Sequence, residues 1–548
     1  MTEFLIANMA PIIFASMVVF LLLGFPVAFA LAANGIVFGL LGIELGLLGP
    51  ELFRALPDRV YGVMSNETLL AVPFFTFMGL ILERSGMAED LLDTIGQLFG
   101  PIRGGLAFAV IIVGALLAAT TGVVAASVIS MGLISLPIML RYGYDKRLAS
   151  GVIAASGTLA QIIPPSLVLI VMADQLGKSV GDMYKGAFIP GFVLTGLYVA
   201  YVAAVAVFRP RQAPALPPEA RTFREPNGKT GGTSLLVLTA LSTAVAIAFA
   251  ETRPPEMPGD EVVVLGIMVG ILFPFVISLI NRVFKLGLLS AMAEKVTFVL
   301  IPPLALIFLV LGTILIGVAT PTEGGAMGAA GALLMALLRG RLDGKQLRQA
   351  MTSTAKLTTF VLFILIGARV FSLTFYGVDG HLWVEHLLVN LPGGVYGFLI
   401  VVNLLVFVLA FFLDYFELAF IIVPLLGPVA EKLGIDLIWF GVLLGVNMQT
   451  SFLHPPFGFA LFFLRSVAPA SVKTSDIYWG AIPFVCIQIV MVALIIAFPQ
   501  LVTGGVEKTQ AVDINAVEIV LPETGYDDEP TPPTSESEPT PGATPSSQ

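Results

Sequence analysis

The sequence predicts an all-α polytopic membrane protein with inverted-topology repeats, each repeat containing a helical hairpin and a helix broken at a Pro-Pro pair. Three observations predict this fold class. Hydrophobic residues make up 57% of the 548 residues and charged residues 12%, about half the charged share of a typical soluble domain. Apolar runs near the ~20 residues needed to cross a bilayer recur along the chain. Two stretches 291 residues apart also share one pattern of Pro, Gly and Asp.

The apolar runs give the expected order of membrane helices. No Lys or Arg precedes the first run at 4–23, so we expect a retained span rather than a cleaved signal. The runs at 105–140 and 394–430 are each too long for one span, and TTG (120–122) and DYFE (414–417) interrupt them. We therefore expect a helical hairpin in each. The other runs lie at 27–48, 68–82, 148–176, 187–208, 235–250, 262–280, 297–318, 323–338, 355–376, 438–464 and 477–500.

Positive charge gives the expected orientation. With the N-terminus outside and each hairpin returning to its own side, six segments face the cytoplasm and carry 20 of the 28 Lys and Arg residues. Cytoplasmic loops are expected to carry such an excess. The six segments are 84–104, 141–147, 209–233, 281–295, 339–356 and 465–473.

Composition divides the chain into four parts. A first repeat, 1–208, and a second repeat, 296–500, flank a basic, Pro-rich linker with an extra helix pair at 209–295. Residues 507–548 form an acidic tail rich in Pro, Ser and Thr, which we expect to be disordered because it offers too few apolar residues for a core.

The repeat pattern predicts both the symmetry and the type of protein. Five residues of the first half recur in the second at a constant separation of 291: Pro137, Gly143, Asp145, Pro164 and Pro165 fall on Pro428, Gly434, Asp436, Pro455 and Pro456. The segment after the first hairpin faces inward and its counterpart faces outward, so the halves are inverted. Inverted repeats with broken helices in matching positions are typical of secondary transporters, whose binding sites lie at the breaks.

The Pro-Pro breaks supply candidate binding residues. Proline has no N–H, so carbonyls one turn upstream lose their helical partners. Free carbonyls and hydroxyls together suit Na⁺, and facing helix ends suit anionic groups. Alternatively, the hydroxyls simply bond across helices. The candidates are Thr120, Thr121, Gly122, Ser156, Thr158, Ala160, Ile163 and Pro165 in the first half, and Phe412, Leu413, Asp414, Asn447, Gln449, Thr450, Ser451, His454 and Phe457 in the second.

Five stretches of the sequence carry a resemblance to a known family: AVPFFTFMGLILERSG (71–86), GYDKRLASGVIAASGTLAQIIPPSLVLIV (143–171), GVATPTEGGAMGAAGALL (317–334), LGID (433–436) and NMQTSFLHPPFGFALFFLRSVAP (447–469). With them the chain resembles the large membrane subunit of tripartite ATP-independent periplasmic (TRAP) transporters, in particular a longer subtype that has an additional helix pair. The resemblance extends over nearly all of residues 1–500.

This resemblance implies a Na⁺-driven elevator-type carrier for an organic acid in the bacterial inner membrane. It implies two partners besides the lipid bilayer, a periplasmic substrate-binding protein and a small four-helix membrane subunit. Na⁺ is the coupling ion, and we expect no other cofactor, no transition metal, no catalysis and no nucleic acid. The implied Na⁺ sites are Thr121, Val123, Ala160, Ile163 and Pro165, and Phe412, Asp414, Ser451, His454 and Phe457; Thr120, Ser156, Thr158, Asn447, Gln449 and Thr450 are substrate-region candidates.

Two positions depart from the family's pattern. TTGVV replaces a serine-rich first tip, so Val123 could offer only its carbonyl. His454 stands where the family commonly has Thr. Its imidazole could bond a freed carbonyl, line the cation site, or sense protons. Asp414 and Glu417 could likewise serve function, as intramembrane acids often do, or cap the second hairpin arm.

Three other kinds of protein compete with this interpretation. An autonomous Na⁺-coupled dicarboxylate or anion carrier would share the inverted hairpins but need no binding protein. An intramembrane enzyme is disfavoured because the chain contains neither HExxH nor GxSxG. A channel fits poorly with inverted broken hairpins.

Overall fold

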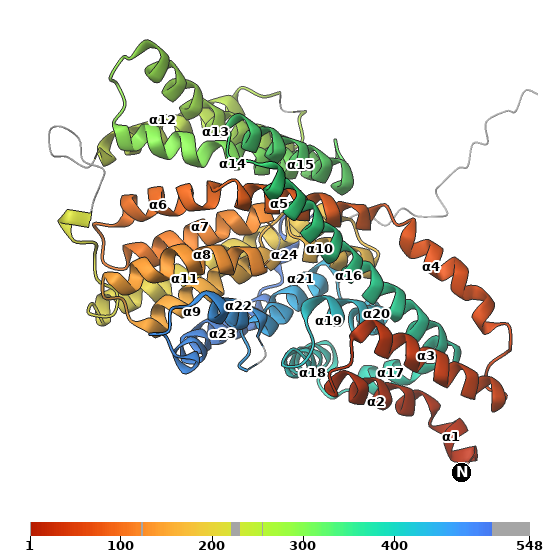
Figure 1. Cartoon of the computed structure of the whole chain (residues 1–548). Coiled ribbons are helices and arrows are strands. Elements are labelled where there is room, and N and C mark those ends of the chain that lie inside the picture. Colours follow the sequence, from red (N-terminus) through yellow and green to blue (C-terminus); the bar gives the residue numbers. More distant parts are fainter. Residues whose placement is uncertain (1, 122–123, 221–230, 255, 457, 507–548) are drawn as a thin grey trace, which may run out of the picture. The chain divides into compact units, whose positions relative to one another are not determined.

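The computed structural model describes residues 2–121, 124–220, 231–254, 256–456 and 458–506, without the side chains of 118–121 and 260. Throughout this part of the chain the regular structure is helical (Figure 1). Eight of the described helices are long and apolar enough to cross a membrane, or ten if two bent helix pairs each count as one span. The predicted all-α membrane fold is confirmed.

The first half contains α1 to α11. The hairpin predicted at 105–140 is formed by α7 and α8. The helices are α1 (Thr2–Ala7), α2 (Met9–Leu22), α3 (Val27–Glu44), η1 (Leu52–Ala55), α4 (Leu56–Met64), η2 (Thr68–Leu70), α5 (Ala71–Arg84), α6 (Met87–Phe99), α7 (Gly105–Thr121), α8 (Val124–Arg141), α9 (Lys146–Thr158), η3 (Leu159–Gln161), α10 (Leu167–Leu176) and α11 (Val180–Phe208).

The second half contains α14 to α24. Its hairpin, predicted at 394–430, has α18 as one arm and α19 with α20 as the other. The helices are α14 (Ala291–Leu315), α15 (Pro321–Leu338), α16 (Gly344–Gly377), α17 (Gly380–Val389), α18 (Gly394–Leu409), α19 (Tyr415–Ile421), α20 (Val423–Lys432), α21 (Leu437–Met448), η5 (Gln449–Phe452), α22 (Phe459–Val467), α23 (Thr474–Ala497) and α24 (Gln500–Thr503).

A linker with an additional helix pair separates the two halves. A single turn, η4 (Pro218–Ala220), precedes α12 (Gly232–Glu251) and α13 (Gly259–Phe284), which form the pair predicted at 235–280. The Ser242 hydroxyl donates a hydrogen bond to the Gly270 carbonyl between the two helices. The pair packs on α14 (Figure 1), so it adds to the second half and leaves the hairpins uncovered.

The two halves correspond at a separation of 291 residues. Adding 291 to α9, η3 and α10 gives α21, η5 and α22 to within one residue at nearly every boundary. The shared Gly and Asp have matching roles in both copies. Gly143 and Gly434 have positive φ values of 82° and 73°, a conformation that favours glycine. Asp145 and Asp436 then cap the next helix, each carboxylate accepting two backbone N–H bonds.

Packing sorts the helices into two groups. In the first, which we call the outer bundle, α3 lies along α16 and α5 lies along α15, with α2, α4, α14 and α17 beside them; α6 lies between α14 and the hairpin helix α7. In the second, the hairpin bundle, α9 packs against α7, α8 and α23, and α21 packs against α10, α11 and α18. Each half thus gives its first helices to the outer bundle and its hairpin and broken helix to the hairpin bundle.

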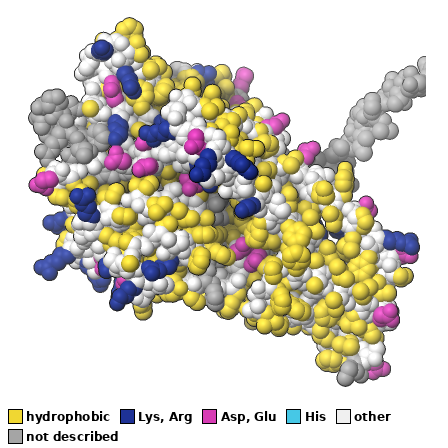
Figure 2. Space-filling view, in the orientation of Figure 1, with side chains coloured by type: hydrophobic (Ala, Val, Ile, Leu, Met, Phe, Trp, Pro, Cys, Tyr) yellow, Lys and Arg dark blue, Asp and Glu magenta, His cyan; other side chains and the backbone are white. Residues whose placement is uncertain are grey.

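The outer surface has the character expected of a protein in a bilayer. Figure 2 shows a broad hydrophobic area where α2, α3 and α16 lie, and Lys and Arg side chains gathered elsewhere in the same view. Phe20, Phe29 and Leu40 are among the exposed residues of this region. Exposed apolar surface on this scale is unusual for a soluble monomer and matches contact with lipid.

The closest helix contact in the hairpin bundle predicts a stability effect. A Cβ atom at Gly151 would lie 2.1 Å from the Gly480 carbonyl oxygen, so α9 and α23 must separate to admit it. We expect Gly151→Ala to destabilise the protein by about 1–3 kcal/mol, seen as a lower melting temperature in detergent. Gly196→Ala is the matched control because nothing lies within 4 Å of its new methyl group. Equal melting temperatures for the two variants would contradict the packing.

Candidate binding site at the helix breaks

The first break separates α9 and η3 from α10. Pro164 and Pro165, joined by a cis peptide bond, give no N–H to the carbonyls of Ala160 and Gln161. The Gln161 carbonyl instead accepts a hydrogen bond from the Ser166 hydroxyl at 2.8 Å. Two buried oxygens nearby have no hydrogen-bond partner, the Gln161 Oε1 and the Ser156 Oγ. The break therefore concentrates oxygen acceptors inside the protein.

The second break repeats this arrangement between η5 and α22. Pro455 and Pro456, also joined by a cis bond, remove the helical partners of the Ser451 and Phe452 carbonyls. The Ser451 hydroxyl is buried and has no partner. The His454 carbonyl accepts a hydrogen bond from Gly458 N at 2.6 Å, so one of its two lone pairs is already used. Unsatisfied buried polar groups are uncommon in folded proteins, and here they occur at both breaks.

One hydrogen bond joins the two breaks directly. The Gln449 amide nitrogen donates to the Thr158 hydroxyl at 3.0 Å, and the two residues are 291 positions apart. Equivalent residues of two repeats can touch only beside the axis that relates the repeats. Gln488, which donates to the Tyr198 hydroxyl at 3.0 Å, lies 3.5 Å from the same Thr158 oxygen. A buried polar network thus lies at the centre of the hairpin bundle.

This network predicts energetic coupling between the breaks. We expect Thr158→Val and Gln449→Leu each to destabilise the protein by about 1–3 kcal/mol, because each leaves a buried polar group unpaired. The double variant should lose less than the sum, with a coupling energy of about 0.5–1.5 kcal/mol. Unfolding of the solubilised variants measures it, and strictly additive losses would contradict the bond.

The tip of the second hairpin is closed by a capping box. The Asp414 carboxylate accepts from Glu417 N, and the Glu417 carboxylate accepts from Asp414 N, both at 2.8 Å. The capping role considered for these acids is therefore present. Glu417 also faces a cavity of about 420 Å³ that Phe412 and Leu413 share with α2, α3 and α16 of the outer bundle. Asp414 could bind a cation only through a carboxylate oxygen that does not already accept the Glu417 N–H.

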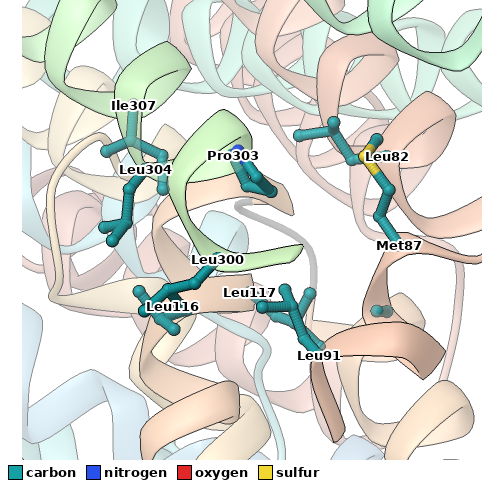
Figure 3. Close-up of a pocket in the computed structure, with 10 residues that line it drawn as sticks. Leu82, Met87, Leu91, Leu116, Leu117, Leu300, Pro303, Leu304 and Ile307 are labelled. Atoms are coloured by element: carbon teal, nitrogen blue, oxygen red, sulfur yellow. The ribbon is translucent and has the colours of Figure 1, made fainter. Parts of the chain in front are cut away.

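A small cavity also lies beside the first hairpin. Its volume is about 10 Å³ and it lies between α7, α14 and the α5–α6 region, with Leu117, Leu91, Leu300 and Pro303 around it (Figure 3). It is about the size of one water probe and its labelled lining is wholly apolar, so it cannot hold an organic acid. A larger cavity of about 390 Å³ lies between α6 and the same hairpin, so each hairpin borders a cavity of several hundred Å³.

His454 packs between two aromatic rings of the second hairpin, one on α18 and one just after it. Its ring stacks on Phe411 with centroids 4.0 Å apart and meets Phe407 edge-on at 4.5 Å. The side chain is buried, and neither ring nitrogen makes a hydrogen bond that meets both distance and angle criteria, although the Ala410 carbonyl lies beside it. The positions 291 residues earlier are Ile163, Thr120 and Leu116, so this aromatic contact belongs to the second half alone.

Four of the predicted substrate-region residues lie in the core. Thr158, Gln449, Thr450 and Asn447 are buried and bonded, Asn447 to the Asn403 carbonyl at 2.8 Å and Thr450 to the Asn447 carbonyl at 2.6 Å. Ala160, Ile163 and Pro165 lie at the first break. Val123 and Phe457 lie outside the described residues, as do the side chains of Thr120 and Thr121.

Sequence reasoning missed Gln161, Gln488 and the Phe407–Phe411 pair. Gln161 stands three residues before Pro164 in AQIIPP, so a search for polar side chains within the break would have found it. The aromatic pair could have been found by comparing hairpin arms at a separation of 291. Within the described residues, no group of three or more His, Cys, Asp or Glu is placed to hold a metal ion.

The comparisons with known proteins agree with this architecture. The model of the family described as "Tripartite ATP-independent periplasmic transporter, DctM component" matches residues 14–501. The chain is 26% identical to the C4-dicarboxylate TRAP transporter large permease protein DctM of Pseudomonas aeruginosa, over 83% of this chain and 89% of that protein. It is 23% identical to the sialic acid TRAP transporter permease protein SiaT of Haemophilus influenzae, over 83% of this chain and 62% of that protein. It is 22% identical to the isethionate TRAP transporter permease protein DctMQ of Oleidesulfovibrio alaskensis, over 84% of this chain and 61% of that protein.

These relatives are named as transporter permeases rather than enzymes. The match spans both repeats, both hairpins and both breaks. The chain is a multi-pass protein of the inner membrane and belongs to the DctM family, the large permeases of tripartite ATP-independent periplasmic transporters.

Proposed function

We propose that this chain is the large permease subunit of a Na⁺-driven, binding-protein-dependent secondary transporter that imports an organic acid. One observation carries the proposal: buried oxygens without hydrogen-bond partners occur at both Pro-Pro breaks, at Ser156, Gln161, Gln449 and Ser451. Burying such groups unpaired costs free energy. A bound cation would satisfy them.

Na⁺ would be held at two equivalent places. At the first, the carbonyls of Ala160, Ile163 and Pro165 would act with Thr121 and Val123 of the first hairpin tip. At the second, Ser451 and the backbone of His454 and Phe457 would act with Phe412 and Asp414. Carbonyls from unwound helix segments are the usual Na⁺ ligands of secondary transporters. Irregular backbone at membrane depth is tolerated where it serves such a site.

The proposed movement is that of an elevator. The hairpin bundle, which carries both breaks, would move as one body against the outer bundle. The helix packing supports this, because each repeat places its hairpin and broken helix in the hairpin bundle and its first helices in the outer bundle.

The proposed substrate class and partners follow from the relatives. Their names specify a C4-dicarboxylate, sialic acid and isethionate, which are all organic acids. We propose an organic acid for this chain as well, delivered by a periplasmic binding protein. The small four-helix membrane subunit would join the outer bundle as its fixed partner.

Removal of single components tests this assignment. The organic acid is first identified as the one that raises the melting temperature of the binding protein encoded beside this chain. Proteoliposomes with all three components and an inward Na⁺ gradient should accumulate it, and omission of the binding protein should abolish uptake. Uptake by this chain alone at the same rate would instead favour an autonomous carrier.

A further inference from the structure

A basic cavity lies away from the helix breaks, on the side that the charge pattern assigns to the cytoplasm. Its volume is about 620 Å³. The start of α9 supplies Lys146 and Arg147, α11 and the residue after it supply Tyr201 and Arg209, and the first half of α23 supplies Trp479. Three separate elements therefore direct cationic and aromatic groups to one place outside the proposed Na⁺ sites.

The walls of this cavity are held in position. The Asp145 amide donates to the Gln212 carbonyl at 3.0 Å, which fixes the segment after α11 against the start of α9. The close approach of Gly151 and Gly480 fixes α9 against α23. Burial raises the pKa of the Tyr144 hydroxyl to about 12, so this wall residue stays neutral. The cavity is thus part of the folded structure rather than a gap between loose loops.

The balance of charge in the cavity favours an anion. Two carboxylates line it, but the Asp145 carboxylate accepts two backbone N–H bonds at the start of α9. The Asp476 carboxylate accepts from Lys473 N at 3.1 Å and lies 3.8 Å from the Arg147 Nε. Within the described part of the chain, the Arg209 side chain makes no hydrogen bond or ion pair. Its guanidinium therefore has N–H donors and a positive charge available to a ligand.

The surroundings of the cavity match the headgroup depth of a membrane leaflet. Trp479, on the cavity wall, is 59% exposed, and Phe208, directly before Arg209, is 82% exposed. Trp residues collect at the membrane–water boundary. Apolar surface therefore adjoins the basic groups on the side where acyl chains would lie. A free phosphate ion has no apolar part that could contact this exposed apolar surface.

We propose that this cavity binds the phosphate group of an anionic phospholipid of the cytoplasmic leaflet. Arg209 and Arg147 contact the phosphate, Tyr201 and Gln212 offer further hydrogen bonds, and the acyl chains run along α11 and α23 past Trp479. Basic pockets between membrane helices on the cytoplasmic side are suited to such headgroups. Binding at this site would attach one end of the hairpin bundle to an anionic phospholipid.

Tryptophan fluorescence gives a direct test. The chain has three Trp residues, and Trp439 is buried, with its indole donating to the Ile495 carbonyl. In proteoliposomes of unlabelled phosphatidylcholine, phosphatidylglycerol brominated near its headgroup should quench Trp479 at a lower mole fraction than brominated phosphatidylcholine. Trp479→Phe gives the background from the other two residues. Equal quenching by both brominated lipids would overturn the proposal.

Charge variants sharpen the test. Arg209→Gln and, separately, Arg147→Gln should each raise the mole fraction of brominated phosphatidylglycerol for half-quenching by about fivefold, the weakening expected for loss of one cation near an anionic lipid. Arg211→Gln is the matched control because Arg211 is exposed two residues away and does not line the cavity. An equal effect of Arg211→Gln, or relief of quenching by millimolar inorganic phosphate, would contradict a lipid site.

Discussion

Replacing Ser451 with alanine is expected to raise the Na⁺ concentration for half-maximal transport by about tenfold or more. The Ser451 hydroxyl is buried at the second break and has no hydrogen-bond partner, so in our account its partner is the coupling ion. An interaction with a charged group contributes about 1.5–3 kcal/mol, and 1.4 kcal/mol corresponds to tenfold in affinity. The measurement is the Na⁺ dependence of organic-acid uptake in proteoliposomes that contain the complete transporter.

Ser466→Ala is the matched control for this prediction. Ser466 is exposed near the end of α22, and its hydroxyl bonds the Phe463 carbonyl within its own helix. Its removal should leave the Na⁺ dependence unchanged. If Ser451→Ala transported with the wild-type Na⁺ dependence, Ser451 would not contact the ion.

The second large effect is expected at His454. The buried imidazole stands at the second break and packs on Phe411 and Phe407. A proton taken up by this ring would place positive charge beside the ion and oppose Na⁺ binding. We therefore expect the apparent Na⁺ affinity of the wild type to fall as the pH is lowered from 8 to 4. His454→Thr should bind Na⁺ more tightly and respond less to pH.

His386→Thr controls for a general effect of removing a histidine. His386 is exposed on α17, far in sequence from the break, and its removal should leave the pH profile of the wild type in place. Superimposable profiles for the wild type and His454→Thr between pH 4 and 8 would show that the imidazole does not set the response.

The sequence predicted the hairpins and the breaks because both have strong local causes. Long apolar runs interrupted at their centres indicate hairpins, and Pro-Pro pairs stop a helix wherever they occur. Three helices, α4, α6 and α17, lie outside every predicted apolar run. In α6, polar Glu89, Asp90 and Asp93 alternate with buried Leu91, Leu92 and Ile95. Such amphipathic helices escape a search for continuous hydrophobicity.

The candidate site could be predicted only in part. The carbonyls freed by Pro164, Pro165, Pro455 and Pro456 follow directly from the chemistry of proline. The Gln449–Thr158 bond does not, because a spacing of 291 in sequence gives no distance in space until the position of the symmetry axis is known. The stacking of His454 on Phe411 likewise depends on how α18 and the residues just after it lie against the break. Sequence reasoning thus identifies groups within one segment better than contacts between segments.

Simultaneous measurement of Na⁺ and organic-acid uptake tests the central claim most directly. Proteoliposomes that contain this chain, the small membrane subunit and the binding protein would be given radioactive Na⁺ and the labelled organic acid. Our account predicts that each flux requires the other and that their ratio stays constant as either concentration is varied. Na⁺ entry at the same rate without the organic acid would contradict coupled transport.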